Sequence, residues 1–423
     1  MATDLFTPIL NDHTRSVRFF NGRLLSGEAM TDEQSGLRMA RELLAQAVGD
    51  GIARGFEVQV AVGSSTTLSP VLAVKPGVAI NRRGEILLLE SDTEVRLVRP
   101  IQPSQAPDRI FQTCTPPQQG VYVADSGVYL LTVCSIGAAN GLAQVTGLGG
   151  IQASCNAKYI VDAVQFRLLE APVDKSLLSN PRLRNLVAYQ CFGVDDLPDF
   201  ATDPFGTTGP PRTLLDKMRE TKQLTDCDVP LALLHWTATG GIQFLDLWSV
   251  RRRVMKTRDA SSFAPFDDRR LILAEAMVLQ FQEQIDSMLR AGTLTADTVA
   301  ASSFRYLPPA GIVPLVGNAP GGIQIAPFFS GKTTRGPAYL ASATLPRFFR
   351  ETLLFDPIDL QSQKLIWLYF EVENIRAANA LGGVPRPRAF VAFANGHVSY
   401  LADARFDVSL WDYSNYALVP PQA

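Results

Sequence analysis

The chain has 423 residues, enough for two or three domains at about 150 residues each. Apolar residues make up 46%, which excludes a chain that is disordered throughout, and the formal net charge of −2 provides no field that would attract nucleic acid or an anionic membrane. No apolar run reaches the length of a membrane-spanning helix and the N-terminus has no signal-peptide pattern, so we expect a cytoplasmic protein.

Cysteine and basic residues add two compositional expectations. The five cysteines are widely spaced without a Cys-x-x-Cys pair, so they indicate buried thiols rather than a metal or redox site. Only 8 of the 39 basic residues are lysines, and arginine suits buried subunit interfaces. Codon bias explains the same excess equally well.

The N-terminal part begins with a turn signal and a long helix. Residues 14–25 are predicted to form a hairpin about Asn21-Gly22, because both turn residues tolerate positive φ. A helix is predicted over 27–48, with Ser26 as its N-cap and Gly49 after its end. One helical stripe collects its apolar positions, which are Met30, Leu37, Ala40, Leu44 and Val48.

Short strands are predicted next, with a few loops between them. The expected strands are 56–60, 71–74, 78–80, 86–89, 127–134, 159–169 and 186–191. The expected long loops are 112–120, 138–150 and 200–212, and a short helix is expected at 214–222.

The second half contains a hairpin, the clearest helix and further strands. Strands 231–237 and 242–248 flank Gly240-Gly241, and the helix 267–290 has its apolar seam at Leu271, Ala274, Val278, Phe281, Ile285 and Met288. Its polar positions, among them Gln280 and Gln284, predict at least one solvent-exposed face. Strands are expected at 323–329, 365–372, 389–394 and 406–410.

These elements predict an α+β fold that is mainly β. We expect a hairpin-rich N-terminal unit over 1–255, a connecting helix region over 256–294 and a β-rich C-terminal domain over 295–423.

Several short motifs carry a resemblance to a known class of proteins. They are Arg18-Phe19-Phe20-Asn21-Gly22-Arg23-Leu24-Leu25, Glu33-Gln34, Gly55-Phe56-Glu57-Val58, Pro76-Gly77-Val78-Ala79-Ile80, Phe244-Leu245-Asp246-Leu247-Trp248 and Ala404-Arg405-Phe406-Asp407. Together the motifs resemble a family of phage-tail-like, baseplate-associated proteins encoded with contractile injection systems. The sequence departs from the family pattern at Gly27, Phe56 and Asn81, where Ala, Leu and Asp are usual. The resemblance implies a structural role in a particle.

Catalytic and cofactor motifs are weak by comparison. The three histidines, His13, His235 and His397, have neither a nucleophile elbow nor a metal-ligand spacing beside them. Ser330-Gly331-Lys332-Thr333 imitates half of a phosphate-binding loop, but Ala326 stands where the first glycine is required. Carboxylate pairs such as Asp195-Asp196, Asp267-Asp268 and Asp356 with Asp359 are typical of caps and solvated charge. We therefore expect no enzyme, cofactor or metal.

Interface residues are expected at two places. Phe19, Phe20, Asn21 and Arg23 surround the N-terminal turn, where one aromatic could dock into a neighbouring subunit. A basic cluster, Arg251, Arg252, Arg253, Arg269 and Arg270, suits an acidic neighbour or a solvated surface better than nucleic acid.

The predicted function is that of a structural subunit of a contractile, phage-tail-like injection particle, at its baseplate or in a shell around it. The expected partners are other particle subunits (baseplate, sheath or tube proteins) and further copies of the chain, with no nucleic acid and no membrane span. The first alternative is a carbohydrate-binding or host-contact module on such a particle. A hydrolase built from distant acids is a weaker one.

Overall fold

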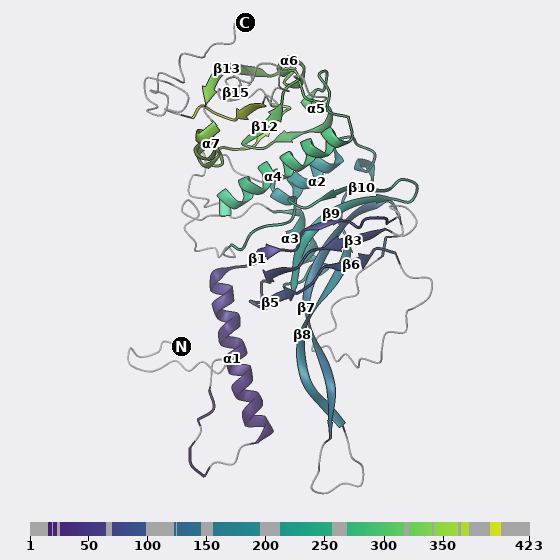
Figure 1. Cartoon of the computed structure of the whole chain (residues 1–423), viewed down its shortest axis with the longest axis vertical. Coiled ribbons are helices and arrows are strands. Elements are labelled where there is room, and N and C mark those ends of the chain that lie inside the picture. Colours follow the sequence, from purple (N-terminus) through teal and green to yellow (C-terminus); the bar gives the residue numbers. More distant parts are fainter. Residues whose placement is uncertain are drawn as a thin grey trace, which may run out of the picture.

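The computed structural model describes most of the chain. The described residues are 16–18, 20–22, 26–64, 70–98, 122–123, 125–144, 155–194, 212–255, 269–316, 321–340, 342–362, 365–371 and 390–398. They form an α+β fold in which short and long strands dominate, with an elongated body and two elements that project from one end of it (Figure 1).

Three antiparallel sheets make up the N-terminal part. The two small sheets have the orders β1-β4-β5 and β2-β3-β6, and the larger sheet has the order β10-β9-β7-β8. Their strands are β1 (Gly51–Gly55), β2 (Val58–Val60), β3 (Val71–Val74), β4 (Gly77–Ile80), β5 (Ile86–Leu89), β6 (Thr93–Arg96), β7 (Gly127–Gln144), β8 (Cys155–Glu170), β9 (Asp228–Thr237) and β10 (Gly241–Asp246).

Side chains on both faces of the larger sheet are buried, which follows from the alternation along β7. Leu131 and Val133 pack with the two small sheets in one core. Val128 and Leu130 point to the opposite face and pack under α2 (Leu183–Phe192) and α3 (Leu214–Glu220) in a second core. The base of the sheet is therefore a central layer of the N-terminal part.

A second four-stranded sheet forms the C-terminal part, with the order β12-β16-β15-β13. β13 runs parallel to β15, and the other two pairings are antiparallel. Its strands are β12 (Ala310–Pro314), β13 (Thr333–Leu340), β15 (Leu365–Glu371) and β16 (Phe390–Ala394); β11 (Tyr306–Leu307) pairs with β14 (Ile358–Asp359) beside it. The helices around it are α5 (Ala300–Ser303), α6 (Ile325–Phe328) and α7 (Leu345–Thr352), with a short 3-10 turn at Ser342–Thr344. A second 3-10 turn, at Lys175–Leu177, belongs to the N-terminal part.

Helix α4 (Arg269–Arg290) lies between the two parts (Figure 1). Phe281 and Ile285 enter the core of the C-terminal sheet. On another side of the helix, Ala276 and Met277 pack against Tyr189 and Phe192 of α2. The seam was predicted correctly at these core positions. The expected exposed face is present at Glu275 and Asp286, but Gln280 and Gln284 are buried because the helix is covered from both parts.

Other predicted elements are confirmed or corrected by the structure. The helix 27–48, the strands 71–74 and 86–89 and the hairpin of β9 and β10 are confirmed. Two predicted strands are helical, since 186–191 lies in α2 and α6 occupies 325–328. The segment 138–144, expected as a loop, continues β7, because β8 supplies a ladder partner as far as the Gln144–Cys155 pair. The strand predicted at 406–410 lies outside the described residues.

Candidate functional site

Two elements project from the same end of the body, helix α1 (Gly27–Val48) and the distal part of the β7–β8 hairpin (Figure 1). We call the hairpin from the Gly137–Asp162 pair onward, with that pair included, the arm. The arm and α1 are joined by an ion pair in which Arg38 Nη2 lies 3.1 Å from Asp162 Oδ1. A projection of this kind presents much surface for its mass, as an assembly element requires.

The sequence fixes the two ends of α1. At its start, Ser26 Oγ accepts a hydrogen bond from Ala29 N at 3.1 Å. At its end, Gly49 adopts a φ of +119° and donates to Ala45 O. The last turns rest on the β4–β5 turn, where Gln46 donates to the Arg83 carbonyl at 2.9 Å. The C-terminal end of the helix is thus anchored to the body, and its N-terminal half extends away from it.

The apolar stripe of α1, defined by Met30, Leu37, Leu44 and Val48, is exposed. The exposed fractions of the four side chains are 48%, 58%, 69% and 60%. The only buried residues of the helix are Ala29 and Ala45. Exposed apolar side chains that line up on one face of a helix are typical of an interaction site. The sequence identified the stripe, but only the structure shows that the body does not cover it.

The arm has the same character. Tyr159, Ile160 and Val161 are consecutive residues of β8, so they point alternately to opposite faces, and all three are exposed. A two-stranded ribbon with no covering layer has little stability of its own in water. Docking against another surface would therefore stabilise the arm as well as bury its apolar side chains.

The predicted N-terminal turn is present, but no strand flanks it in the described residues 16–18 and 20–22. Asn21 and Gly22 form the turn, with Gly22 at a φ of +89°, and Phe20 is 63% exposed. The hairpin expected here is therefore wrong for the described residues. Phe19 and Arg23 lie outside them.

Two of the five predicted interface arginines, Arg251 and Arg252, instead donate hydrogen bonds to carbonyl oxygens of the same chain. Arg251 is buried, and its guanidinium donates to the carbonyl oxygens of Gly55 and Phe56. Arg252 donates to three carbonyl oxygens of the preceding turn and lies over the ring of Phe192, 4.9 Å from its centroid. The expectation that these two residues face an acidic neighbour is corrected, because their charges satisfy backbone carbonyls of a non-helical segment.

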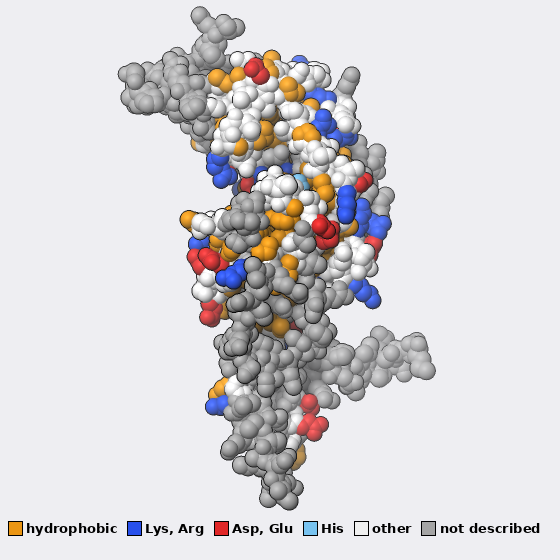
Figure 2. Space-filling view, turned by 90° about the vertical axis from the view of Figure 1, so that its right-hand side faces the viewer, with side chains coloured by type: hydrophobic (Ala, Val, Ile, Leu, Met, Phe, Trp, Pro, Cys, Tyr) orange, Lys and Arg blue, Asp and Glu red, His pale blue; other side chains and the backbone are white. Residues whose placement is uncertain are grey.

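Two of the remaining arginines form ion pairs at the surface. Arg253 is paired with Glu275 of α4 at 3.0 Å, and Arg270 is paired with Asp356 at 2.9 Å. Arg269 opens α4, but its side chain is outside the described part of the structure. Basic side chains on the face shown in Figure 2 are accompanied by acidic ones, in keeping with the net charge near zero.

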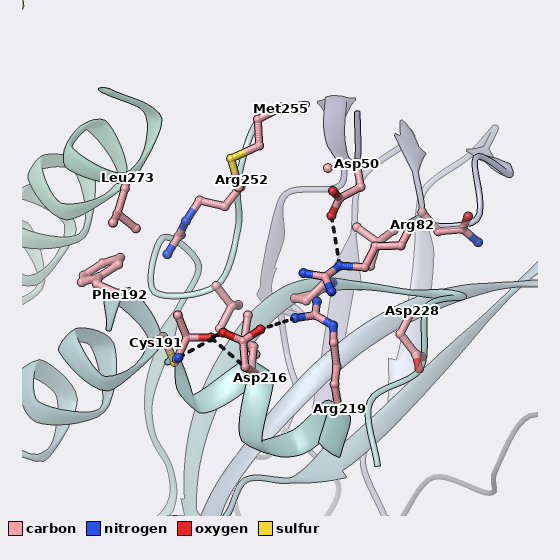
Figure 3. A pocket seen from close by; sticks show the side chains of 17 residues that line it. Asp50, Arg82, Cys191, Phe192, Asp216, Arg219, Asp228, Arg252, Met255 and Leu273 are labelled. Atoms are coloured by element: carbon pink, nitrogen blue, oxygen red, sulfur yellow. Dashed lines mark hydrogen bonds and ion pairs between the residues drawn. The ribbon is translucent and has the colours of Figure 1, made fainter. Parts of the chain in front are cut away.

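A polar cavity of about 100 Å³ lies where β1, the β4–β5 turn, α2, α3 and α4 meet (Figure 3). Arg82 Nε is 3.7 Å from Asp50 Oδ2, and Arg219 Nη1 is 3.3 Å from Asp216 Oδ1. Burial and the neighbouring Arg82 lower the pKa of Arg219 to about 10.

Carboxylates line the cavity beside its arginines. Burial opposes ionisation of Asp216, but hydrogen bonds from Thr213 and the nearby arginines outweigh it and lower the pKa of Asp216. The third acid of the lining, Asp228, forms a buried ion pair with Arg167 on its other side. Arg252 also lines the cavity, so three arginines and three aspartates surround it, and one of the aspartates is paired with Arg167. These charges join the elements around the cavity.

Two of the described cysteines are unsuited to nucleophilic chemistry. Burial raises the pKa of the Cys134 and Cys191 thiols to about 12, so both stay protonated. Burial lowers the pKa of His235. Lys332 of the imitation phosphate loop donates to the Ser362 carbonyl at 2.9 Å. Among the described residues, no three or more His, Cys, Asp or Glu side chains lie together as a metal site requires.

The described aromatic cluster that would suit a sugar platform is also covered. The ring of Trp367 lies 4.5 Å from that of His397, centroid to centroid, and the Arg335 guanidinium lies over it at 5.5 Å. A sugar ring requires an open aromatic face, so this cluster does not favour the carbohydrate alternative.

No model of a protein family matches the chain, and no curated protein matches it in sequence. Within the described residues, no helix is long and apolar enough to cross a membrane.

Proposed function

We propose that the chain is a structural subunit of a contractile, phage-tail-like injection particle, located at the baseplate or in a shell around it. The observation that carries the proposal is the pair of projecting elements, α1 and the arm, which expose apolar side chains away from the body (Figure 1). The short motifs of the N-terminal half resemble those of baseplate-associated proteins, and this resemblance is why we propose a phage-tail-like particle.

Two further observations agree with a structural role. The Cys134 and Cys191 thiols are buried and stay protonated at neutral pH, and Lys332 of the loop that imitates a phosphate site donates to the Ser362 carbonyl. The proposed partners are other subunits of the particle, namely baseplate, sheath or tube proteins, together with further copies of the chain. Assembly would take place in the cytoplasm.

The experiment is particle incorporation, with the arm as the tested element. Particles are sedimented from cells that express the chain together with the sheath and tube genes of its own locus, and the chain is quantified in the pellet. Ile160→Ser should leave the melting temperature of the isolated chain nearly unchanged, because the side chain is already in solvent. It should lower incorporation several-fold.

Leu354→Ser is the matched control. Leu354 is exposed like Ile160 and has a side chain of the same size, but it belongs to the C-terminal part of the body. It should be incorporated like the wild type. Absence of the wild-type chain from sheath-containing particles would overturn the proposed function, whereas equal incorporation of the two variants would overturn the role of the arm.

A further inference from the structure

The apolar stripe of α1 has a period of seven residues at Met30, Leu37 and Leu44. Seven residues are close to two full turns of a helix, so the three side chains lie nearly in line, with a drift of about 20° per step. The helix has 22 residues and is therefore about 33 Å long. The line from Met30 to Leu44 covers about 21 Å of it, at 1.5 Å per residue, and such a straight apolar line fits another helix laid along it.

Charged residues flank the centre of the stripe symmetrically. Glu33 precedes Leu37 by four residues and Arg41 follows it by four, so each lies about 6 Å along the axis from Leu37. Both are within about 40° of the Leu37 direction around the helix, at 100° per residue. The acid and the base therefore border the apolar line on either side of its midpoint.

From this arrangement we infer that α1 pairs with α1 of a second copy, antiparallel and centred on Leu37. Reversal about Leu37 places Met30 level with Leu44 of the other copy and Glu33 level with its Arg41. The two-fold axis generates each contact twice, as in a closed isologous dimer. A parallel pair would instead bring Glu33 level with Glu33 and Arg41 level with Arg41, which is repulsive.

The contacts that α1 makes within its own chain leave this line accessible. Arg38, which reaches the arm, is one residue from Leu37 and so points about 100° away from it. Glu33 accepts a hydrogen bond from Val17 N at 2.8 Å, and a carboxylate has capacity for further donors. Arg41 contacts only its own helix in the described residues, where Nε lies 3.4 Å from the Leu37 carbonyl. The inferred dimer concerns the isolated chain and does not depend on the proposed function.

The test is the oligomeric state of the purified full chain and its charge variants. Analytical ultracentrifugation over about 1 to 500 µM should show a reversible monomer–dimer equilibrium for the wild type. Glu33→Arg and Arg41→Glu alone should each weaken dimerisation at least about tenfold, because each leaves like charges level with one another. The double variant Glu33→Arg/Arg41→Glu should restore it to within a few-fold.

Two leucine variants complete the design. Leu37→Asp should leave the chain monomeric at every concentration, whereas Leu88→Asp, at an exposed leucine of β5, should dimerise like the wild type. Circular dichroism and melting curves confirm that each variant folds. A wild type that is monomeric throughout, or a double charge reversal that does not recover dimerisation, would overturn the antiparallel pair.

Discussion

The buried carboxyl of Glu283 makes the stability of the chain depend on pH in a direction opposite to that of an ordinary acid. Arg184 of α2 donates from Nε to Asp246 Oδ2 at 2.7 Å and reaches Glu283 Oε1 of α4 at 3.2 Å. Gln280 of α4 also donates to Asp246, at 2.9 Å. These side chains form one polar contact between α4 and the N-terminal part, with two acids for one arginine.

Burial, reinforced by the nearby Asp246, raises the pKa of Glu283 from its ordinary 4.5 to about 7. The folded chain then binds this proton more tightly than the unfolded chain does. The stabilising contribution of Glu283 is therefore complete below pH 4.5 and is lost as the pH rises to about 7. Between pH 5 and pH 8 the loss amounts to about 2.5 kcal/mol by proton linkage.

Substitution of Glu283 by Gln removes the titration and keeps an oxygen that can accept from Arg184. Because the side chain is 23% exposed, solvent screening reduces the expected effect. We expect Glu283→Gln to gain about 1–2 kcal/mol relative to the wild type between pH 5 and pH 8. Urea denaturation at the two pH values, followed by tryptophan fluorescence, measures the difference.

The matched control is Glu275→Gln on the same helix, where the carboxylate is 44% exposed and paired with Arg253. It should change the stability by about 0.5 kcal/mol or less, since exposed ion pairs contribute little. The reasoning is refuted if Glu283→Gln destabilises the chain more at pH 8 than at pH 5, because Glu283 would then act as an ordinary ionised partner of Arg184.

Four further predictions concern stability. Asp228→Ala should cost about 3–5 kcal/mol in denaturant unfolding, because it leaves the fully buried guanidinium of Arg167 without its partner; a cost below about 1 kcal/mol would contradict this. Gly55→Ala should prevent folding of the N-terminal sheets, as judged by circular dichroism, since the residue has a φ of +67° and a Cβ would lie 1.8 Å from a carbonyl oxygen. Arg252→Glu should cost about 3 kcal/mol and Arg253→Glu about 0.5 kcal/mol, since only the former donates to three carbonyls; equal melting temperatures would refute the distinction. A strong chelator should leave the melting temperature unchanged, and a fall of many degrees would disprove this.

Local sequence signals were enough to predict the elements whose ends are set by residues next to them in the chain. The helix α1 begins after the Ser26 cap and ends at Gly49, and both signals act within one turn of the residues that they control. The hairpins of β4 with β5 and of β9 with β10 were predicted for the same reason, since a turn and the strands beside it are contiguous in the chain. The core seam of α4 at Phe281 and Ile285 follows from helical periodicity alone.

Apolar runs without a decisive period were misassigned. Residues 186–191 are apolar almost throughout, so periodicity does not distinguish a buried strand from a buried helix. The usable signal is Gly193, which adopts the left-handed conformation that ends α2. In β7, residues 137–141 are small or polar and have low strand propensity, and they join the ladder because β8 lies beside them.

Whether a stripe or a charge meets the body or the solvent was decided by the tertiary structure. The stripes of α1 and α4 both follow a helical period in the sequence, yet α4 is covered from two sides while α1 projects from the body. Arg251 and Arg253 are two residues apart, yet the first is buried against Gly55 and Phe56 and the second is at the surface. The sequence specifies that these side chains belong together on one face or in one cluster. What covers them depends on segments far away in the sequence, whose position no local pattern encodes. Phe56, which covers Arg251, is nearly 200 residues from it.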